Sequence, residues 1–151
     1  MTQLSPHFTL EELTTTSSGA DNTPNAQERQ LLTTLAQFLE KVRTILGNKP
    51  ITINSAFRSR AVNRVVGGVD NSAHTLCYAV DIECPAFGTP YQVAMALDAA
   101  EKAGKIKFDQ LIHEKIISEG SNWVHISRDP RLRGQRLTTF DRVNYPSGIL
   151  P

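Results

Sequence analysis

Two histidines and one aspartate are the residues of this chain whose types best fit metal chemistry. His74 follows a polar turn, and Asp81 comes seven residues later inside the apolar run 79–82. His125 lies in the middle of a second strand-like run, residues 123–127. Two imidazoles and one carboxylate are a ligand set of catalytic zinc, which leaves a fourth coordination position open for water. The three residues therefore predict a zinc site of the hydrolytic type.

Each of these residues also has an ordinary structural explanation. A histidine on an apolar strand is often partly buried for packing reasons alone, and Asp81 could face solvent from the polar side of its strand. A buried carboxylate without a partner is costly, so a buried Asp81 would need a cation or strong hydrogen-bond donors. Spacing alone leaves both interpretations open, because the candidate ligands are far apart in the sequence.

Length and composition predict one globular domain over residues 1–151. Hydrophobic residues make up 40% of the chain and charged residues 21%, which is typical of soluble globular proteins. The formal net charge of +1 gives no electrostatic reason to expect a nucleic-acid partner. Cys77 and Cys84 would flank one extended strand, too far apart to form a disulfide, and we expect free thiols.

The chain shows no apolar run long enough to insert into a membrane. Its first residues, 1–6, lack the basic and apolar regions of a signal peptide. We therefore expect a protein that is made in the cytoplasm and, if it acts outside, leaves by another route such as lysis. We also expect it to be a monomer.

Periodicity predicts the elements that must position the three candidate ligands. Thr9 and Glu12 form a capping-box pattern that opens a short helix, and apolar residues at helical spacing predict a long helix that stops before Gly47. Shorter helices are expected at 61–66 and from Pro90 to Gly104. Strands are expected at 51–55, 79–83, 108–113, 123–127 and 137–143. An antiparallel pair joined across residues 119–121 favours an α+β fold, with a mainly antiparallel sheet packed against helices.

The candidate ligands belong to a longer pattern that resembles a known family. Ser72-x-His74-x6-Asp81, followed by Trp123-x-His125, resembles the zinc D-alanyl-D-alanine carboxypeptidases and their relatives. Those relatives include the phage L-alanyl-D-glutamate endopeptidases, and the hedgehog signalling domain shares the fold. The resemblance extends from Phe8 to Ser127 and includes the segments 8–13, Ser55-x-Phe57-Arg58, Asn63 and Gly67-Gly68. It implies a hedgehog-like fold, Zn²⁺ bound by His74, Asp81 and His125, and peptidoglycan stem peptides as substrate.

Two positions depart from the family pattern. Cys77 stands where the family usually has glycine, so either the backbone is built differently there or the thiol is a competing soft ligand. Asn122 stands where many members have an acid, three residues before the second histidine. An amide cannot act as a general base, so the base must come from elsewhere.

Glu114 is the favoured general base, and Glu119 is the alternative. Glu114 ends a strand whose sequence, 109–114, resembles a segment of some family members, whereas Glu119 lies in a turn with Gly120. The ordinary explanation for Glu114 is a surface carboxylate near Lys115. We expect His113 to be an exposed strand histidine, with a proton shuttle beside Glu114 as the alternative.

Arg58 and Ser72 are the candidate substrate-binding residues. A guanidinium binds carboxylates through two parallel hydrogen bonds, and the resemblance implies that Arg58 holds the substrate or polarises its carbonyl. Ser72 either hydrogen-bonds the substrate or caps the turn before His74. Trp123 either lines the substrate site or packs in the core.

Two functions are consistent with these residues. The favoured one is a zinc peptidase, a carboxypeptidase or an endopeptidase, that cleaves peptidoglycan stem peptides as a phage or prophage lysis enzyme. The alternative is a non-catalytic, zinc-stabilised binding domain on the same fold.

Overall fold

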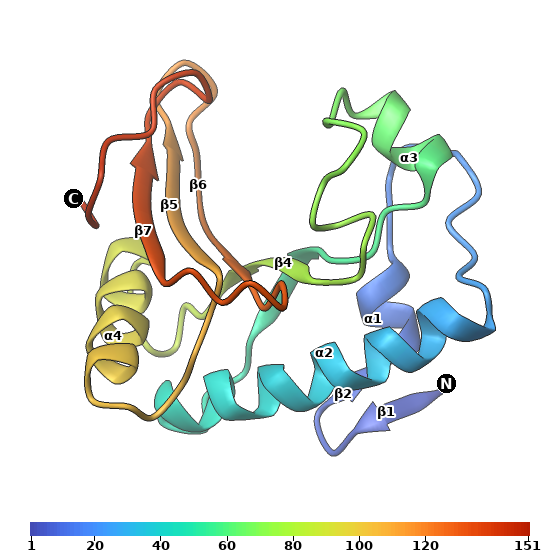
Figure 1. Ribbon diagram of the computed structural model, residues 1–151, viewed down its shortest axis with the longest axis horizontal. Coiled ribbons are helices and arrows are strands. Elements are labelled where there is room, and N and C mark those ends of the chain that lie inside the picture. The colour runs from blue at the N-terminus through green and yellow to red at the C-terminus, as the bar shows by residue number, and fades with distance from the viewer.

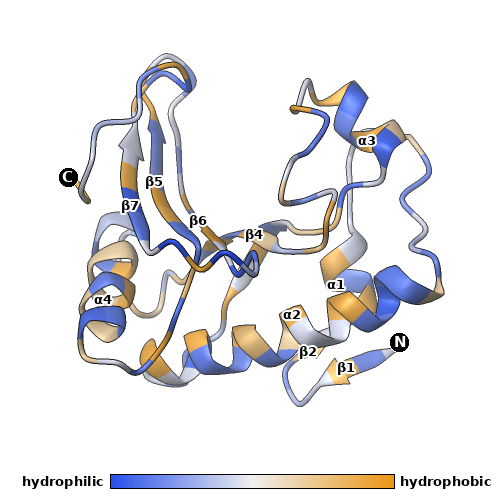
Figure 2. Cartoon of the chain, in the orientation of Figure 1, coloured by the Kyte–Doolittle hydropathy of each residue, from blue (hydrophilic) through white to orange (hydrophobic).

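Helix α2 (Ala26–Ile45) is the longest element of the computed structural model, which describes residues 1–151 (Figure 1). Asn25 and Glu28 form a capping box at its start, and Gly47 follows its end with a φ of +73°. Apolar and polar residues alternate along the helix at helical spacing (Figure 2). The buried side chains are Leu32, Leu35, Ala36, Phe38, Leu39 and Val42. They form one face of the hydrophobic core.

A five-stranded sheet crosses the molecule in the order β3-β4-β6-β5-β7. Its strands are β3 (Thr52–Ser55), β4 (Ala79–Glu83), β5 (Gln110–Ile116), β6 (Ser121–Ser127) and β7 (Gln135–Thr139). Every neighbouring pair is antiparallel except β5 and β7, which are parallel. The expected α+β fold with a mainly antiparallel sheet is confirmed.

The two faces of the sheet have different roles. Successive side chains of a strand point to opposite faces. On one face, Val80, Ile82, Val124 and Ile126 pack into the core with α2 and α4 (Pro90–Lys102). The other face carries Asp81, Glu114 and His125, and we call it the site face.

The N-terminal elements and α3 complete the fold. They are β1 (Gln3–Ser5), β2 (Phe8–Thr9), α1 (Leu10–Thr14) and α3 (Arg60–Val65). The capping box of Thr9 and Glu12 is present at the start of α1, as predicted. The β1–β2 hairpin, which the sequence did not predict, packs against α2.

The last strand ends earlier than predicted. β7 stops at Thr139 rather than at residue 143, because the Asp141 carboxylate accepts hydrogen bonds from the backbone N–H groups of Val143 and Asn144, both at 2.8 Å. Such bonds hold a turn rather than a strand. β5 and β6, in contrast, extend further toward the turn that joins them than the sequence predicted.

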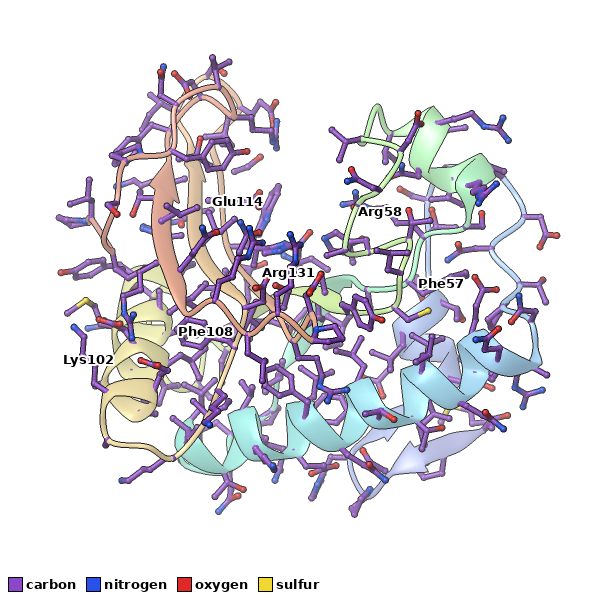
Figure 3. The ribbon with its side chains drawn as sticks, viewed as in Figure 1. Phe57, Arg58, Lys102, Phe108, Glu114 and Arg131 are labelled. Carbon is purple, nitrogen blue, oxygen red and sulfur yellow. The ribbon has the colours of Figure 1, made fainter.

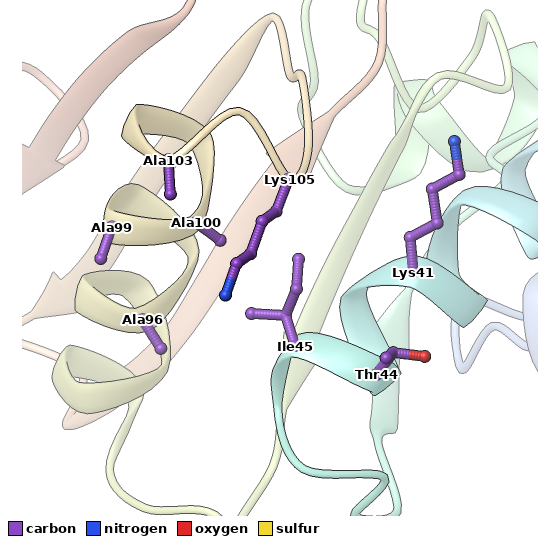
Figure 4. A pocket seen from close by; sticks show the side chains of 8 residues that line it. All are labelled: Lys41, Thr44, Ile45, Ala96, Ala99, Ala100, Ala103 and Lys105. Atoms are coloured by element: carbon purple, nitrogen blue, oxygen red, sulfur yellow. The ribbon is translucent and has the colours of Figure 1, made fainter.

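Two further features of the fold lie outside the site. A groove of about 750 Å³ lies between α2 and α4, and alanines and two lysines, Lys41 and Lys105, line it (Figure 4). None of the candidate site residues borders this groove. None of the helices combines the length and hydrophobicity that crossing a bilayer requires.

Candidate metal centre

The sheet brings the three predicted metal ligands together. Asp81 on β4 lies directly opposite His125 on β6, so both side chains emerge side by side on the site face. His74 arrives from the turn that precedes β4. His125 Nδ1 lies 3.0 Å from one Asp81 carboxylate oxygen, and His74 Nε2 lies 3.4 Å from the other. One potential ligand atom from each residue falls within 4.8 Å of the other two.

The His74 ring is held in the tautomer that a metal ion needs. Its Nδ1 lies 2.8 Å from the backbone carbonyl of Ala56, which only accepts hydrogen bonds. Nδ1 therefore carries the proton, and the lone pair of Nε2 points toward Asp81. Metal-binding histidines are commonly oriented by such a bond from the second ring nitrogen. Two imidazoles and a carboxylate, with one imidazole oriented in this way, fit a zinc ion.

Burial and charge make Asp81 the electrostatic centre of the cluster. The residue is 5% exposed, so it does not face solvent. Burial alone would raise the pKa of its carboxyl, but the imidazoles of His74 and His125 together hold that pKa below its ordinary value. Burial in turn opposes protonation of His125, whereas the Asp81 carboxylate raises the pKa of that imidazole. Asp81 thus stays an ionised carboxylate, which is the form that binds a cation.

Arg58 lies beside the cluster, as predicted. It follows β3, and its Nη2 is 3.7 Å from an Asp81 carboxylate oxygen. Its Nε donates to Ser55 Oγ at 3.3 Å, and its backbone N–H donates to the carbonyl of His74 at the same distance. These contacts fix the guanidinium next to the candidate ligands, where it is able to meet a substrate.

Glu114 lies on the site face of β5, opposite Trp123 of β6. Figure 3 shows it and Arg58 on opposite parts of the molecule, with β4 between them. Burial, and then the negative charge of Asp81, raise the pKa of the Glu114 carboxyl above its ordinary value. The carboxylate forms no ion pair, and Lys115 points to the other face of the sheet. Glu114 is therefore a half-buried acid that is available to exchange a proton.

Comparison with known proteins agrees with this geometry. A family model described as Peptidase M15 matches residues 6–127, most of the chain. The chain belongs to the peptidase M15 family. It is also similar to the zinc D-Ala-D-Ala carboxypeptidase of Streptomyces albus G, with 46% identity over 44 residues. That alignment covers 29% of this chain and 17% of the relative, so the chain spans only a small part of that protein's length.

In this M15 chain, Asn122 lies away from the candidate metal site, so its amide does not take the place of a base there. Asn122 belongs to the opposite face of β6 from His125, and its Oδ1 lies 2.8 Å from His113 Nε2. An acid at this position would point away from the three ligands. The departure from the family pattern therefore leaves the site face unchanged.

The expectation that His113 is an exposed strand histidine is wrong. Its side chain is fully buried, and its Nδ1 lies 2.7 Å from the carbonyl of Leu150. His113 and Glu114 are consecutive on β5, so they lie on opposite faces and His113 does not adjoin the Glu114 carboxylate. His113 instead connects the C-terminal segment of the M15 chain to the sheet.

Glu119, the alternative base, lies in the turn between β5 and β6. Its side chain is 49% exposed and forms an ion pair with Arg142. Hydrogen bonding to Arg142 lowers the pKa of this carboxyl. A solvated, paired carboxylate with a lowered pKa is a weaker candidate for proton transfer than Glu114.

Cys77 keeps the backbone conformation that glycine favours. Its φ is +64°, in the left-handed region, although it carries a side chain. The buried thiol is not part of the group of converging ligand atoms, and burial raises its pKa to about 12. It is therefore a neutral thiol rather than the thiolate that a metal binds.

Ser72 has a structural role in the turn before His74. Its Oγ accepts a hydrogen bond from the backbone N–H of His74 at 3.3 Å, and its carbonyl accepts from Thr75 at 3.0 Å. These hydrogen bonds agree with the explanation that Ser72 caps the turn, and contact of Ser72 with the substrate stays a prediction.

Sequence reasoning missed two residues beside the site face, Arg142 and Tyr145. The Arg142 guanidinium lies 5.7 Å from the centre of the Trp123 ring. The charge of Arg142 opposes the rise in the pKa of Glu114, whereas burial and then the charge of Glu114 raise the pKa of Tyr145. They lie beyond the segment that matches the M15 family. No local motif marks them, because only the folded chain brings this turn to β5 and β6.

Proposed function

We propose that this chain is a zinc-dependent peptidase that cleaves peptidoglycan stem peptides. The observation that carries the proposal is a half-buried Glu114, without an ion pair, on the same face as the convergent His74, Asp81 and His125. Family membership supports the reaction class, and the similarity to a zinc D-Ala-D-Ala carboxypeptidase supports the metal and the substrate class.

The three side chains would hold the metal ion and leave a coordination position open for chemistry. Structural zinc sites usually have four protein ligands, whereas catalytic sites have three and an open position. Here Cys77, the nearest candidate by sequence for a fourth ligand, is not in the cluster. When bound, zinc supplies an acidified water molecule and a Lewis acid for the scissile carbonyl. This favours a catalytic site over a purely structural one.

Glu114 and Arg58 have separate roles in the proposed reaction. Glu114 takes a proton from the attacking water at a carboxylate oxygen and then delivers it to the leaving amine. Its raised pKa brings it closer to neutral pH than an ordinary carboxyl group, which suits both transfers. Arg58 donates hydrogen bonds to a carboxylate or carbonyl oxygen of the substrate and so orients the scissile bond.

The biological setting is a part of the same proposal. The motif resembles that of phage endopeptidases, which supports a lysis enzyme that is made in the cytoplasm and acts on the cell wall after release. We also propose that it works as a monomer, because one chain supplies all the residues assigned to the reaction.

The decisive experiment is mass spectrometry of the fragments released from purified peptidoglycan, with and without a zinc chelator. We expect peptide fragments in the absence of chelator and none in its presence. Their masses assign the cleaved bond and so distinguish a carboxypeptidase from an endopeptidase. Bound zinc without any fragment would instead favour the non-catalytic binding domain.

Replacing the base tests the mechanism directly. Glu114→Gln should lower kcat by at least about 100-fold, because a positioned base typically contributes that much or more. Zinc content and melting temperature should stay close to those of the wild type, since the carboxylate has no ion pair to lose. The matched variant Glu119→Gln should retain activity. If Glu114→Gln retains activity and Glu119→Gln does not, Glu119 is the base; if both retain it, the assignment of a glutamate base is wrong.

A further inference from the structure

The turn 140–145, which follows β7, forms an ordered structure next to the site face. Asp141 accepts hydrogen bonds from the backbone N–H groups of Val143 and Asn144 and from the Asn144 side chain, each at 2.8 Å. The backbone N–H of Arg142 donates to Thr139 Oγ1 at 2.8 Å. Thr139 in turn lies opposite Glu114 across the β5–β7 pair. The turn is thus fixed relative to the proposed base.

Arg142 presents an unused edge of its guanidinium group. The group lies over the Trp123 ring, and its Nη1 pairs with Glu119. The structure gives Nε and Nη2 no hydrogen-bond partner, and the side chain is 41% exposed. The N–H groups of Nε and Nη2 lie parallel on one edge, which is the geometry that binds a carboxylate through two hydrogen bonds. The ion pair with Glu119 holds this edge in place without occupying it.

Tyr145 adds a polar group to the same place. Tyr145 directly follows Asn144, whose backbone N–H donates to Asp141, so it ends the same ordered turn that carries Arg142. The residue is 43% exposed, and a phenol donates a hydrogen bond. Burial, and then the charge of Glu114, raise the pKa of this phenol, which therefore stays protonated. Arg142 and Tyr145 thus offer a cation and a neutral donor on one turn.

The two arginines near the site lie on opposite sides of it. Arg58 contacts Asp81 on the side of β3 and β4. Arg142 contacts Trp123, two residues before His125, on the side of Glu114. A peptide bound with its scissile bond between His125 and Glu114 would extend toward a guanidinium in each direction.

We propose that Arg142 and Tyr145 form a second carboxylate-binding subsite, so that the enzyme recognises two carboxylates of one peptide, one at each end of the site. This inference rests on the proposed function, because it takes the same site as the place of peptide binding. The substrate class is an acidic peptide with two carboxylates at some distance from each other. Arg58 binds one of them, and Arg142 binds the other.

The test measures binding and therefore needs no turnover. The zinc-loaded protein carries Glu114→Gln in every arm, so that peptides stay intact. The ligand is the synthetic peptide L-Ala-γ-D-Glu-L-Lys-D-Ala-D-Ala, which has two carboxylates, one on D-Glu and one at the C-terminus. Two further peptides have one or the other carboxylate amidated. Titration calorimetry then gives Kd for each peptide with and without Arg142→Gln.

We expect Arg142→Gln to weaken binding of the unmodified peptide roughly tenfold, as the loss of a charge-assisted pair would. It should have almost no effect on the one amidated peptide that lacks the carboxylate bound by Arg142. Arg58→Gln should show the same selectivity for the other amidated peptide. Arg142→Lys, which keeps the charge but loses the two-donor edge, should be intermediate, and Tyr145→Phe should weaken binding a few-fold.

A matched control separates recognition from general effects. Arg29→Gln removes one exposed positive charge on α2, far from the site face. It should leave Kd within twofold of the parent. Equal weakening of all three peptides by Arg142→Gln, no weakening, or no binding of any peptide would each overturn the subsite.

The subsite and the proposed peptidase function can each fail without the other. Selective loss in the binding assay, together with no cleavage by the chain with native Glu114, would retain the subsite and reject the peptidase. Cleavage without selective loss would retain the peptidase and reject the subsite.

Discussion

Asp81 shows how a single buried charge organises the site. It lies between His74 and His125 and within 3.7 Å of the Arg58 guanidinium, all in a nearly solvent-free environment. A carboxylate in such a place is stabilised only by the positive charges and donors around it. Because both imidazoles turn their metal-binding nitrogens toward it, the residues that stabilise the charge are also the ones that would share the cation.

Cys77 gives the first prediction at this scale. Cys77→Gly should change the free energy of unfolding by less than about 1 kcal/mol, because relief of the left-handed backbone offsets the loss of a small buried side chain. Cys77→Val should destabilise by more than about 2 kcal/mol, since a β-branched residue is strongly disfavoured at positive φ. Denaturant unfolding measures both changes.

Zinc content is the control for Cys77→Gly. It should remain equal to that of the wild type, because the thiol is outside the ligand cluster and its raised pKa keeps it protonated. Reduced zinc in Cys77→Gly would instead support the thiol as a soft metal ligand.

Among the elements, those with a local signal were the ones that sequence predicted best. β4 has the predicted bounds, and α1 and α2 begin at recognisable caps, because period and cap chemistry depend on neighbouring residues. The parallel pairing of β7 with β5 was not predicted, since it depends on residues far apart in the chain. The error at His113 has the same cause. The run 111–113 does not reveal which face meets the core.

The site residues also divide into those that the sequence predicted and those that only the fold reveals. Residue types, together with the resemblance to a known family, predicted the three convergent residues and the place of Arg58 beside them. The Ala56 carbonyl that orients His74, and the approach of Arg142 to Trp123, exist only in the folded chain. Sequence reasoning therefore identified the side chains that converge at the candidate site and missed most of the groups that position them.

The loop between β6 and β7 gives a prediction at the element scale. Arg133 hydrogen-bonds the buried Asp109 carboxylate through Nε at 2.8 Å and Nη2 at 2.7 Å, and its backbone N–H adds a third bond. Hydrogen bonding to Arg133 lowers the pKa of Asp109. A lowered pKa contributes stability that is fully present above the unfolded-state pKa and is lost as pH falls through the folded-state value.

Asp109→Asn should therefore destabilise the protein by about 1–2 kcal/mol at neutral pH. The difference between variant and wild type should shrink below about pH 4, where the wild-type carboxylate also becomes protonated in the unfolded chain. Urea unfolding at a series of pH values measures this. A difference that stays constant down to pH 2 would contradict the assigned ion pair. Asp70→Asn, in an exposed turn, is the control and should have little effect at any pH.

At the scale of the whole molecule, the C-terminal segment links the sheet edge to the site. Residues 146–150 run beside β7, where the Thr138 N–H donates to the Pro146 carbonyl at 3.0 Å and the Gly148 N–H donates to the Arg136 carbonyl at 2.8 Å. The C-terminus lies next to β7 in Figure 1. The segment covers a strand that would otherwise present an open edge. It also anchors the far end of the turn that carries Arg142 and Tyr145.

Deleting residues 146–151 should test this connection. The deletion removes the bonds to β7 and the contact of His113 with Leu150, and it leaves the turn 140–145 attached at one end only. At about 1 kcal/mol for each lost hydrogen bond, less the entropy regained by the released segment, we expect a net loss of about 2–3 kcal/mol. For a chain of this size, that corresponds to a melting temperature lower by roughly 5–10 °C.

The deletion should leave the zinc content unchanged, because His74, Asp81 and His125 belong to the centre of the sheet and the turn beside it. Peptide affinity, however, should fall as in Arg142→Gln. Leu150→Ala, which keeps every backbone bond of the segment, should retain both affinity and most of the stability. A truncated protein with wild-type peptide affinity would show that the turn needs no support from the C-terminal segment.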